Sequence, residues 1–203
     1  MTRSATRRGF LAGAVAGLAV GPARAAEFAY KGWSFDTARA GGPLLDALVR
    51  SLQAQIDIVE AIDIKPDIRA FFRDVPKEIV PHTPLGPGAY DFDKRRMFLD
   101  RQIDPPQNPV LLHELLHAYH QQRLPDGLKN PRIIAFFEAA SLSGQFPPQA
   151  YMLTNATEFF AMCASVVLWG HAARLPFTRA HVRETLPLFY DWIVAQFTPD
   201  GAL

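Results

Sequence analysis

Apolar residues recur at steps of three and four along most of the chain, a spacing that places them on one face of an α-helix. The segment from Pro43 to about Ile62 has this spacing, and Pro43 is suited to the first turn of a helix. A shorter segment of the same kind begins at Pro66 and runs through Phe72. The pattern therefore predicts two helices in the first half of the chain.

The second half is dominated by helical patterns. We expect helices from Val110 to about Leu124, from Pro131 to about Gly144, over residues 156–169 and over residues 179–197. Pro187 lies inside the last segment, where its missing N–H and its ring disturb the preceding helical turn. The last helix should therefore be kinked or split at Pro187.

Short apolar segments, broken repeatedly by proline and glycine, separate the two helical regions. Glu78–Val80 and Arg96–Leu99 have the length of strands, whereas residues 27–42 are mixed and glycine-rich, as in a loop or a short strand. No change in composition marks a domain boundary. The prediction is a mainly helical α+β fold, in which a small β element precedes the helix that begins at Val110.

The first 25 residues have the features of an export signal. Thr6–Leu11 reads Thr-Arg-Arg-Gly-Phe-Leu, and an uncharged apolar run follows from Phe10 to Val20. As a helix that run would be about 16 Å long, half of the roughly 30 Å that a membrane span requires. Ala23 and Ala25 form the small-x-small pattern of a signal-peptidase site.

The segment 1–25 resembles a twin-arginine secretion signal, and the alternative is a basic arm followed by a buried helix. The resemblance implies recognition by the twin-arginine translocation machinery and cleavage of the signal. The domain would then be residues 26–203, periplasmic or secreted, with no stable membrane span.

Composition and charge exclude several other classes. The 203 residues are 49% hydrophobic and 20% charged, as in a globular chain that can bury a core. The formal charge is +1, but removal of residues 1–25 takes away four of the 21 basic residues and none of the acidic ones. Without a basic run, no nucleic-acid partner is expected. The single cysteine, Cys163, lies in an apolar run and is expected to be a buried small hydrophobic residue.

His113-Glu114-Leu115-Leu116-His117 matches the pattern H-E-x-x-H within the helix predicted from Val110. Four residues turn by about 400°, so both imidazoles lie on one face, about 6 Å apart along the axis. Each can direct a nitrogen at one Zn²⁺ ion at about 2.0–2.1 Å. Glu114 lies beside that position, where a general base can take a proton from a zinc-bound water. The alternative is a core helix whose histidines form a polar edge.

A catalytic zinc commonly has a third protein ligand and one open position. His120 is on nearly the same face as His113, but about 10.5 Å along the axis, too far for ligands of one ion. Four candidates remain farther along the chain: Glu138, Glu158, His171 and His181. The two glutamates are each a lone acid in an apolar helical pattern, which is unfavourable unless something satisfies the charge.

Each glutamate also has an explanation without a metal. Glu138 would lie on the solvent edge of its helix. Asn155 and Glu158 have the spacing of a capping box, in which the glutamate bonds back to the backbone of the capping residue. The residues alone leave this choice open.

An H-E-x-x-H motif followed about forty residues later by Glu-Phe-Phe-Ala resembles the gluzincin metallopeptidases, and in particular the catalytic domain of anthrax lethal factor. The resemblance rests on His113–His117 and Tyr151–Ala161. It implies a zincin-like fold with zinc bound by His113, His117 and Glu158. It also implies that Glu114 is the base and that Tyr151, seven residues before Glu158, faces the substrate.

The expected function is that of a secreted zinc-dependent hydrolase that cleaves peptides or proteins. Glu114 would deprotonate the attacking water, and Tyr151 would donate a hydrogen bond to the oxyanion unless it is an ordinary loop tyrosine. The strand at Arg96–Leu99 could hold an extended peptide by edge pairing. The alternatives are a non-catalytic periplasmic metal-binding or scaffold module with a zincin fold, and a zinc amidase that acts on cell-wall material.

Overall fold

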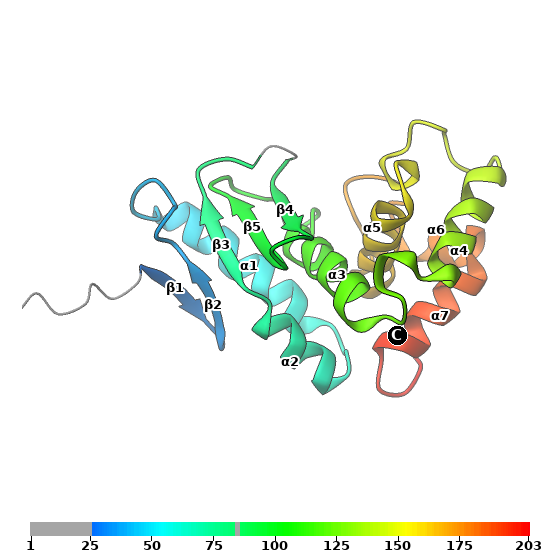
Figure 1. Cartoon of the computed structure of the whole chain (residues 1–203), viewed down its shortest axis with the longest axis horizontal. Helices are drawn as coiled ribbons and strands as arrows, with labels where there is room; N and C mark the ends of the chain where they lie inside the picture. Colours follow the sequence, from blue (N-terminus) through cyan, green and yellow to red (C-terminus); the bar gives the residue numbers. More distant parts are fainter. Residues whose placement is uncertain (1–25, 84–85) are drawn as a thin grey trace, which may run out of the picture.

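A computed structural model describes residues 26–83 and 86–203. The predicted export signal at 1–25 lies outside the described residues. The sheet, with the helices at residues 46–61 and 66–74, lies at the left of Figure 1, the helices that follow residue 130 lie at the right, and the helix at 110–123 lies between them. The first half contains β1 (Glu27–Tyr30), β2 (Trp33–Asp36), α1 (Asp46–Ala61), α2 (Pro66–Asp74), β3 (Lys77–Val80), β4 (Gly88–Asp91) and β5 (Arg96–Asp100). The second half contains α3 (Val110–Arg123), η1 (Gly127–Lys129), α4 (Pro131–Leu142), η2 (Tyr151–Leu153), α5 (Ala156–Trp169), α6 (Arg179–Thr185) and α7 (Pro187–Phe197).

The five strands form one sheet in the order β1-β2-β3-β5-β4. β1 and β2 form an antiparallel hairpin, for which Lys31 and Gly32 supply positive φ angles of 48° and 78° at the turn. β2 and β3 pair in parallel, as do β3 and β5, whereas β4 turns back antiparallel to β5. The order leaves β4 at the edge of the sheet, next to α3.

The expectation that the strand at Arg96–Leu99 offers a free edge is wrong. β5 pairs with β3 on one side and with β4 on the other, so both of its edges are occupied. The reason is a tight turn after β4, in which the Asp91 side chain accepts hydrogen bonds from the N–H groups of Asp93 and Lys94. This turn folds β4 back over the outer edge of β5, and β4 becomes the edge strand instead.

The helices follow the apolar periodicity closely. α3, α4 and α5 begin at the predicted residues, and the C-terminal segment is split at Pro187 into α6 and α7. α1 begins at Asp46, three residues later than expected, and β4 and the β1–β2 hairpin were not resolved by the sequence pattern. The mixed α+β architecture, mainly helical with a small sheet before α3, is confirmed.

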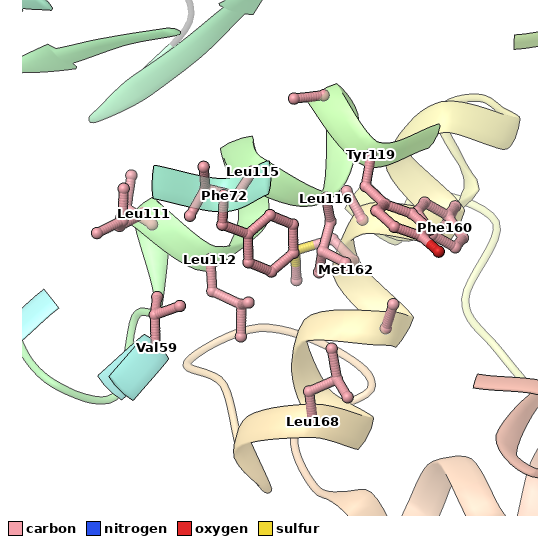
Figure 2. Packing of buried hydrophobic residues seen from close by; sticks show 14 of the residues in the cluster. Val59, Phe72, Leu111, Leu112, Leu115, Leu116, Tyr119, Phe160, Met162 and Leu168 are labelled. Carbon is pink, nitrogen blue, oxygen red and sulfur yellow. The ribbon is translucent and has the colours of Figure 1, made fainter. Parts of the chain in front are cut away.

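α3 and α5 pack against each other at the centre of the core (Figure 2). Leu111, Leu112, Leu115 and Leu116 of α3 are fully buried. Each contributes about 1.5–3 kcal/mol through removal of its side chain from water. Cys163 is fully buried in α5, as predicted. The rigid packing of these two helices fixes the polar side chains that they carry. In the part of the chain that the structure describes, no helix is both long enough and apolar enough to cross a membrane.

Candidate metal centre and active site

α3 brings the two motif histidines together. The Nε2 atoms of His113 and His117 lie 3.0 Å apart, and their rings are nearly perpendicular, with centroids 4.7 Å apart. One turn of a helix whose other faces are buried in the core separates them. The side chains of His113 and His117 therefore point from a rigid support to one common position.

Glu158 approaches the same position from the first turn of α5. Its Oε2 atom lies 3.2 Å from Nε2 of His113 and 3.5 Å from Nε2 of His117. The helix is capped by Asn155, whose side chain accepts hydrogen bonds from the N–H groups of Thr157 and Glu158. Because Asn155 alone caps the helix start, the carboxylate of Glu158 is available to the histidines.

The three side chains fit a zinc ion. Tetrahedral bonds of about 2.0–2.1 Å place neighbouring ligand atoms roughly 3.3 Å apart, and the three separations here are 3.0, 3.2 and 3.5 Å. Oε2 of Glu158 is buried, and no described residue gives it a well-directed hydrogen bond. Two imidazoles and a carboxylate are also a ligand set that zinc accepts. Within the described residues, His113, His117 and Glu158 form a group able to hold a metal ion.

The electrostatics of the group favour an ionised carboxylate. Burial alone would raise the pKa of Glu158, but the close approach of the His113 and His117 imidazoles outweighs burial and holds this pKa well below its usual range. Burial alone would lower the pKa of His113, and the two nearby carboxylates raise it above its ordinary value. An anionic oxygen among imidazoles is the state that a cation binds.

Glu114 lies beside this group, on the side of α3 that faces β4. Burial raises the pKa of its carboxyl above the ordinary value, while His113, His117 and a hydrogen bond from the backbone N–H of Tyr90 act in the opposite direction. A carboxylate of raised basicity next to a metal site is suited to general-base catalysis near neutral pH.

Gly88 of β4 leaves room for Glu114. A Cβ atom at Gly88 would lie 2.9 Å from Cγ and 3.0 Å from Oε1 of Glu114, and 2.8 Å from Cγ1 of Val110. Real Cβ atoms essentially never come so close, so a side chain here would displace the carboxylate. The sequence showed Gly88 only as one of several chain-breaking residues, because nothing in its local pattern reveals the neighbouring helix.

Tyr151 lies in η2 and faces the same group. Its ring centroid is 6.5 Å from that of His113. Burial, followed by the negative charge of the nearby Glu158, raises the pKa of Tyr151 above its ordinary value. The hydroxyl therefore stays protonated and able to donate.

The other candidate ligands lie elsewhere. Glu138 is exposed on α4, as expected of a glutamate on the solvent edge of its helix that binds no metal. His120 is fully buried on α3 and packs against Phe160, with ring centroids 5.0 Å apart. His171 is exposed, and His181 packs against the ring of Phe146. Of the candidate third ligands, the structure brings only Glu158 to the motif histidines.

A pocket of about 370 Å³ opens over His113 and Glu114. It extends from the edge of β4 and the connection between β5 and α3 to the turn that follows α5. Polar or charged residues are prominent among its lining groups, with Asp104, His113, Glu114, Tyr151 and Arg174 among them. A substrate in this pocket would contact both the base and the metal site.

No protein-family model matches the chain, and no curated protein matches its sequence. Among solved structures, the chain is similar to the Pro-Pro endopeptidase PPEP-2 from Paenibacillus alvei. The superposition has a TM-score of 0.56 and 17% sequence identity, and it covers 79% of this chain and 97% of that one. The likeness is one of fold. The chain shares the mixed α+β fold of that protein, with the H-E-x-x-H helix at its centre.

Proposed function

We propose that the protein is a zinc-dependent peptidase of the gluzincin type. The observation that carries the proposal is the convergence of His113, His117 and Glu158 on one position, beside a pocket whose wall includes His113 and Glu114. The fold shared with an endopeptidase supports the same reaction class. The resemblance to the lethal factor catalytic domain supports the gluzincin subfamily as a further part of the proposal. The resemblance of residues 1–25 to a twin-arginine signal supports action outside the cytoplasm.

A zinc ion, when bound, supplies Lewis acidity that makes water more acidic and a scissile carbonyl more electrophilic. His113, His117 and Glu158 are the residues that would hold it. Glu114 accepts a proton from the attacking water as the new C–O bond forms at the carbonyl carbon. It then delivers that proton to the amine nitrogen as the C–N bond breaks, so Glu114 ends the cycle ionised.

Tyr151 serves the developing negative charge on the carbonyl oxygen. Its side chain lines the pocket together with His113, so its hydroxyl can donate a hydrogen bond to the carbonyl oxygen of a substrate bound there. β4 takes the role first given to the segment Arg96–Leu99, because β4 is the edge strand beside the site. An extended peptide would form backbone hydrogen bonds with the groups of β4 that Glu114 does not contact.

The test compares wild type with Glu114→Gln in zinc content and in hydrolysis of a mixed peptide library. Wild type should contain one zinc per chain and cleave peptides. Glu114→Gln should retain the zinc and lose about 10²- to 10⁴-fold in turnover, the contribution expected of a positioned base.

Two results would contradict the proposal. Zinc binding by wild type without any hydrolysis would identify a metal-binding or scaffold module. Cleavage of peptidoglycan fragments with no cleavage of linear peptides would identify a cell-wall amidase instead.

A further inference from the structure

Arg174 is an exposed, positively charged residue in the wall of the catalytic pocket. Its Cζ atom lies 5.2 Å from the ring centroid of Tyr151, so the guanidinium stacks over the ring that faces His113. No carboxylate of the described residues lies within salt-bridge distance of Arg174. Its hydrogen-bond donors are therefore available to a group that enters the pocket.

The turn that carries Arg174 is held firmly in place. Its two ends form a β-bridge between His171 and Thr178. Inside the turn, the N–H of Ala172 donates to the carbonyl of Phe177 at 2.8 Å, and the N–H of Phe177 donates to the carbonyl of Arg174 at 2.9 Å. These hydrogen bonds hold the backbone of Arg174 in place, which lowers the entropy lost when a ligand binds.

The turn is also fastened to the helix that carries Glu158. Gly170 ends α5 with a φ of 110°, a left-handed conformation that favours glycine and starts the turn directly. Beyond the turn, Arg179 donates from Nε to the carbonyl of Val167 at 2.6 Å and from a terminal nitrogen to that of Leu168 at 2.9 Å. Arg174 and Glu158 therefore belong to one rigid unit.

Other charges in the pocket do not neutralise Arg174. Glu114 is buried beside the metal site, and Asp104 lies in the connection between β5 and α3, where its carboxylate accepts a hydrogen bond from Gln102. No ion pair joins Asp104 to Arg174. A planar guanidinium without a partner is the group that best binds a carboxylate, through two parallel hydrogen bonds.

We propose that Arg174 binds a carboxylate of the substrate near the scissile bond, so that the pocket selects acidic peptides. The inference rests on the proposed peptidase function. Arg174 is 5.2 Å from the Tyr151 ring, which is 6.5 Å from His113. Because an extended chain advances about 3.3 Å per residue, the bound carboxylate belongs within about three residues of the cleaved bond. It is either an Asp or Glu side chain or the C-terminal carboxylate.

The experiment measures kcat/KM for two series of peptides that wild type cleaves. In the first series the C-terminus is amidated, and Glu or Gln is placed at each of three positions on either side of the cleaved bond. In the second series no acidic side chain is present, and a free or amidated C-terminus lies one to three residues from that bond. We expect wild type to prefer the carboxylate at one position by about tenfold or more, and the series that shows this preference identifies the source.

Substitutions at Arg174 test whether that residue causes the preference. Arg174→Gln should reduce the ratio of kcat/KM for the Glu and Gln peptides to about one, and Arg174→Glu should reverse it in favour of Gln. The matched control is Arg132→Gln, because Arg132 also stacks over aromatic rings, those of Phe136 and Trp192, outside the pocket. Arg132→Gln should keep the wild-type ratio, and all three variants should keep their zinc.

A preference that survives in Arg174→Gln would overturn the proposal, and so would equal cleavage of acidic and neutral peptides by wild type. In both cases the peptidase function would stand. Wild type that binds zinc and cleaves no peptide in a mixed library, acidic or neutral, would instead overturn the proposed function itself.

Discussion

Two segments of nearly the same composition end in opposite surroundings. Glu138 lies in Phe-Phe-Glu-Ala-Ala on α4, and Glu158 lies in Thr-Glu-Phe-Phe-Ala on α5. Glu138 is exposed to solvent, whereas the carboxylate of Glu158 is largely buried between two imidazoles. The difference arises because α5 packs along α3 and starts beside the motif histidines, while Glu138 faces outward from α4. Apolar neighbours in sequence thus reveal a helix but not the direction in which its one acid points.

The largest expected effect, which tests the difference between Glu158 and Glu138, is loss of the metal. Glu158→Ala should weaken zinc binding by more than about 100-fold, because two histidines alone lack the anionic donor and the third position of the tetrahedron. Glu138→Ala should leave zinc affinity unchanged. Titration with a competing chelator gives both affinities, and circular dichroism checks the fold. If Glu138→Ala lost the metal while Glu158→Ala kept it, the assignment of the third ligand would be wrong.

Tyr151 lies near Glu158 and not near Glu138, so removal of its hydroxyl tests what the surroundings of Glu158 contribute to the reaction. Tyr151→Phe should retain zinc and the packing of the ring but lose about 10²- to 10³-fold in kcat, the usual cost of removing one oxyanion donor. Single-turnover kinetics on a cleaved peptide provides the measurement. An unchanged kcat would show that Tyr151 is an ordinary tyrosine of the pocket wall.

His117 and His120 repeat the contrast on α3, one facing the metal site and the other facing Phe160. Burial lowers the pKa of His120 to about 4, so the folded protein holds this ring neutral. The unfolded chain binds the proton first as the pH falls below about 6.5, and the stability contributed by neutral His120 is lost from there down to about pH 4.

For the metal-free protein, His120 alone should therefore reduce the free energy of unfolding by about 2 kcal/mol between pH 7 and pH 5. Urea unfolding at both pH values measures the loss, and His120→Leu should remove this part of it. Equal losses in wild type and His120→Leu would show that the ring is not held neutral.

The smallest expected effect concerns the space beside Glu114. Gly88→Ala should cost about 1–3 kcal/mol of stability through overpacking against Val110 and Glu114, and it should lower kcat by displacing the base. Gly144→Ala is the control, since its φ of 68° is unfavourable for alanine, a backbone strain that Gly88 lacks, but nothing lies within 4 Å of the new Cβ. Gly144→Ala should lose stability without losing kcat. Equal kcat values in the two variants would contradict a steric role for Gly88.

The sequence predicted the helices well because α3 and α5 each bury an apolar surface long enough to show a period. It did not resolve β4 or the β1–β2 hairpin, since strands of four residues carry too few alternations. It also placed the free edge of the sheet on the wrong strand. Strand order depends on how β4 folds back over β5, which no local pattern encodes.

The site divides in the same way. His113, Glu114 and His117 were found because four residues of one helix fix their geometry. Glu158 was chosen over Glu138 only through a family resemblance, because the packing of α5 against α3 is a property of the whole fold. Gly88 and Arg174 were missed altogether, since each acquires its role from an element distant in the sequence.

The approach of Glu158 to His113 and His117 also has a mechanical consequence. A metal held by these three side chains would act as a cross-link between α3 and α5, closing a loop of roughly forty residues. Such a cross-link stabilises the folded state by the binding free energy that the unfolded chain lacks. Because the turn bearing Arg174 continues directly from α5, release of the metal would loosen both α5 and the part of the pocket wall that carries Arg174. A chelator would then remove the ability to choose among peptides together with the ability to cleave them.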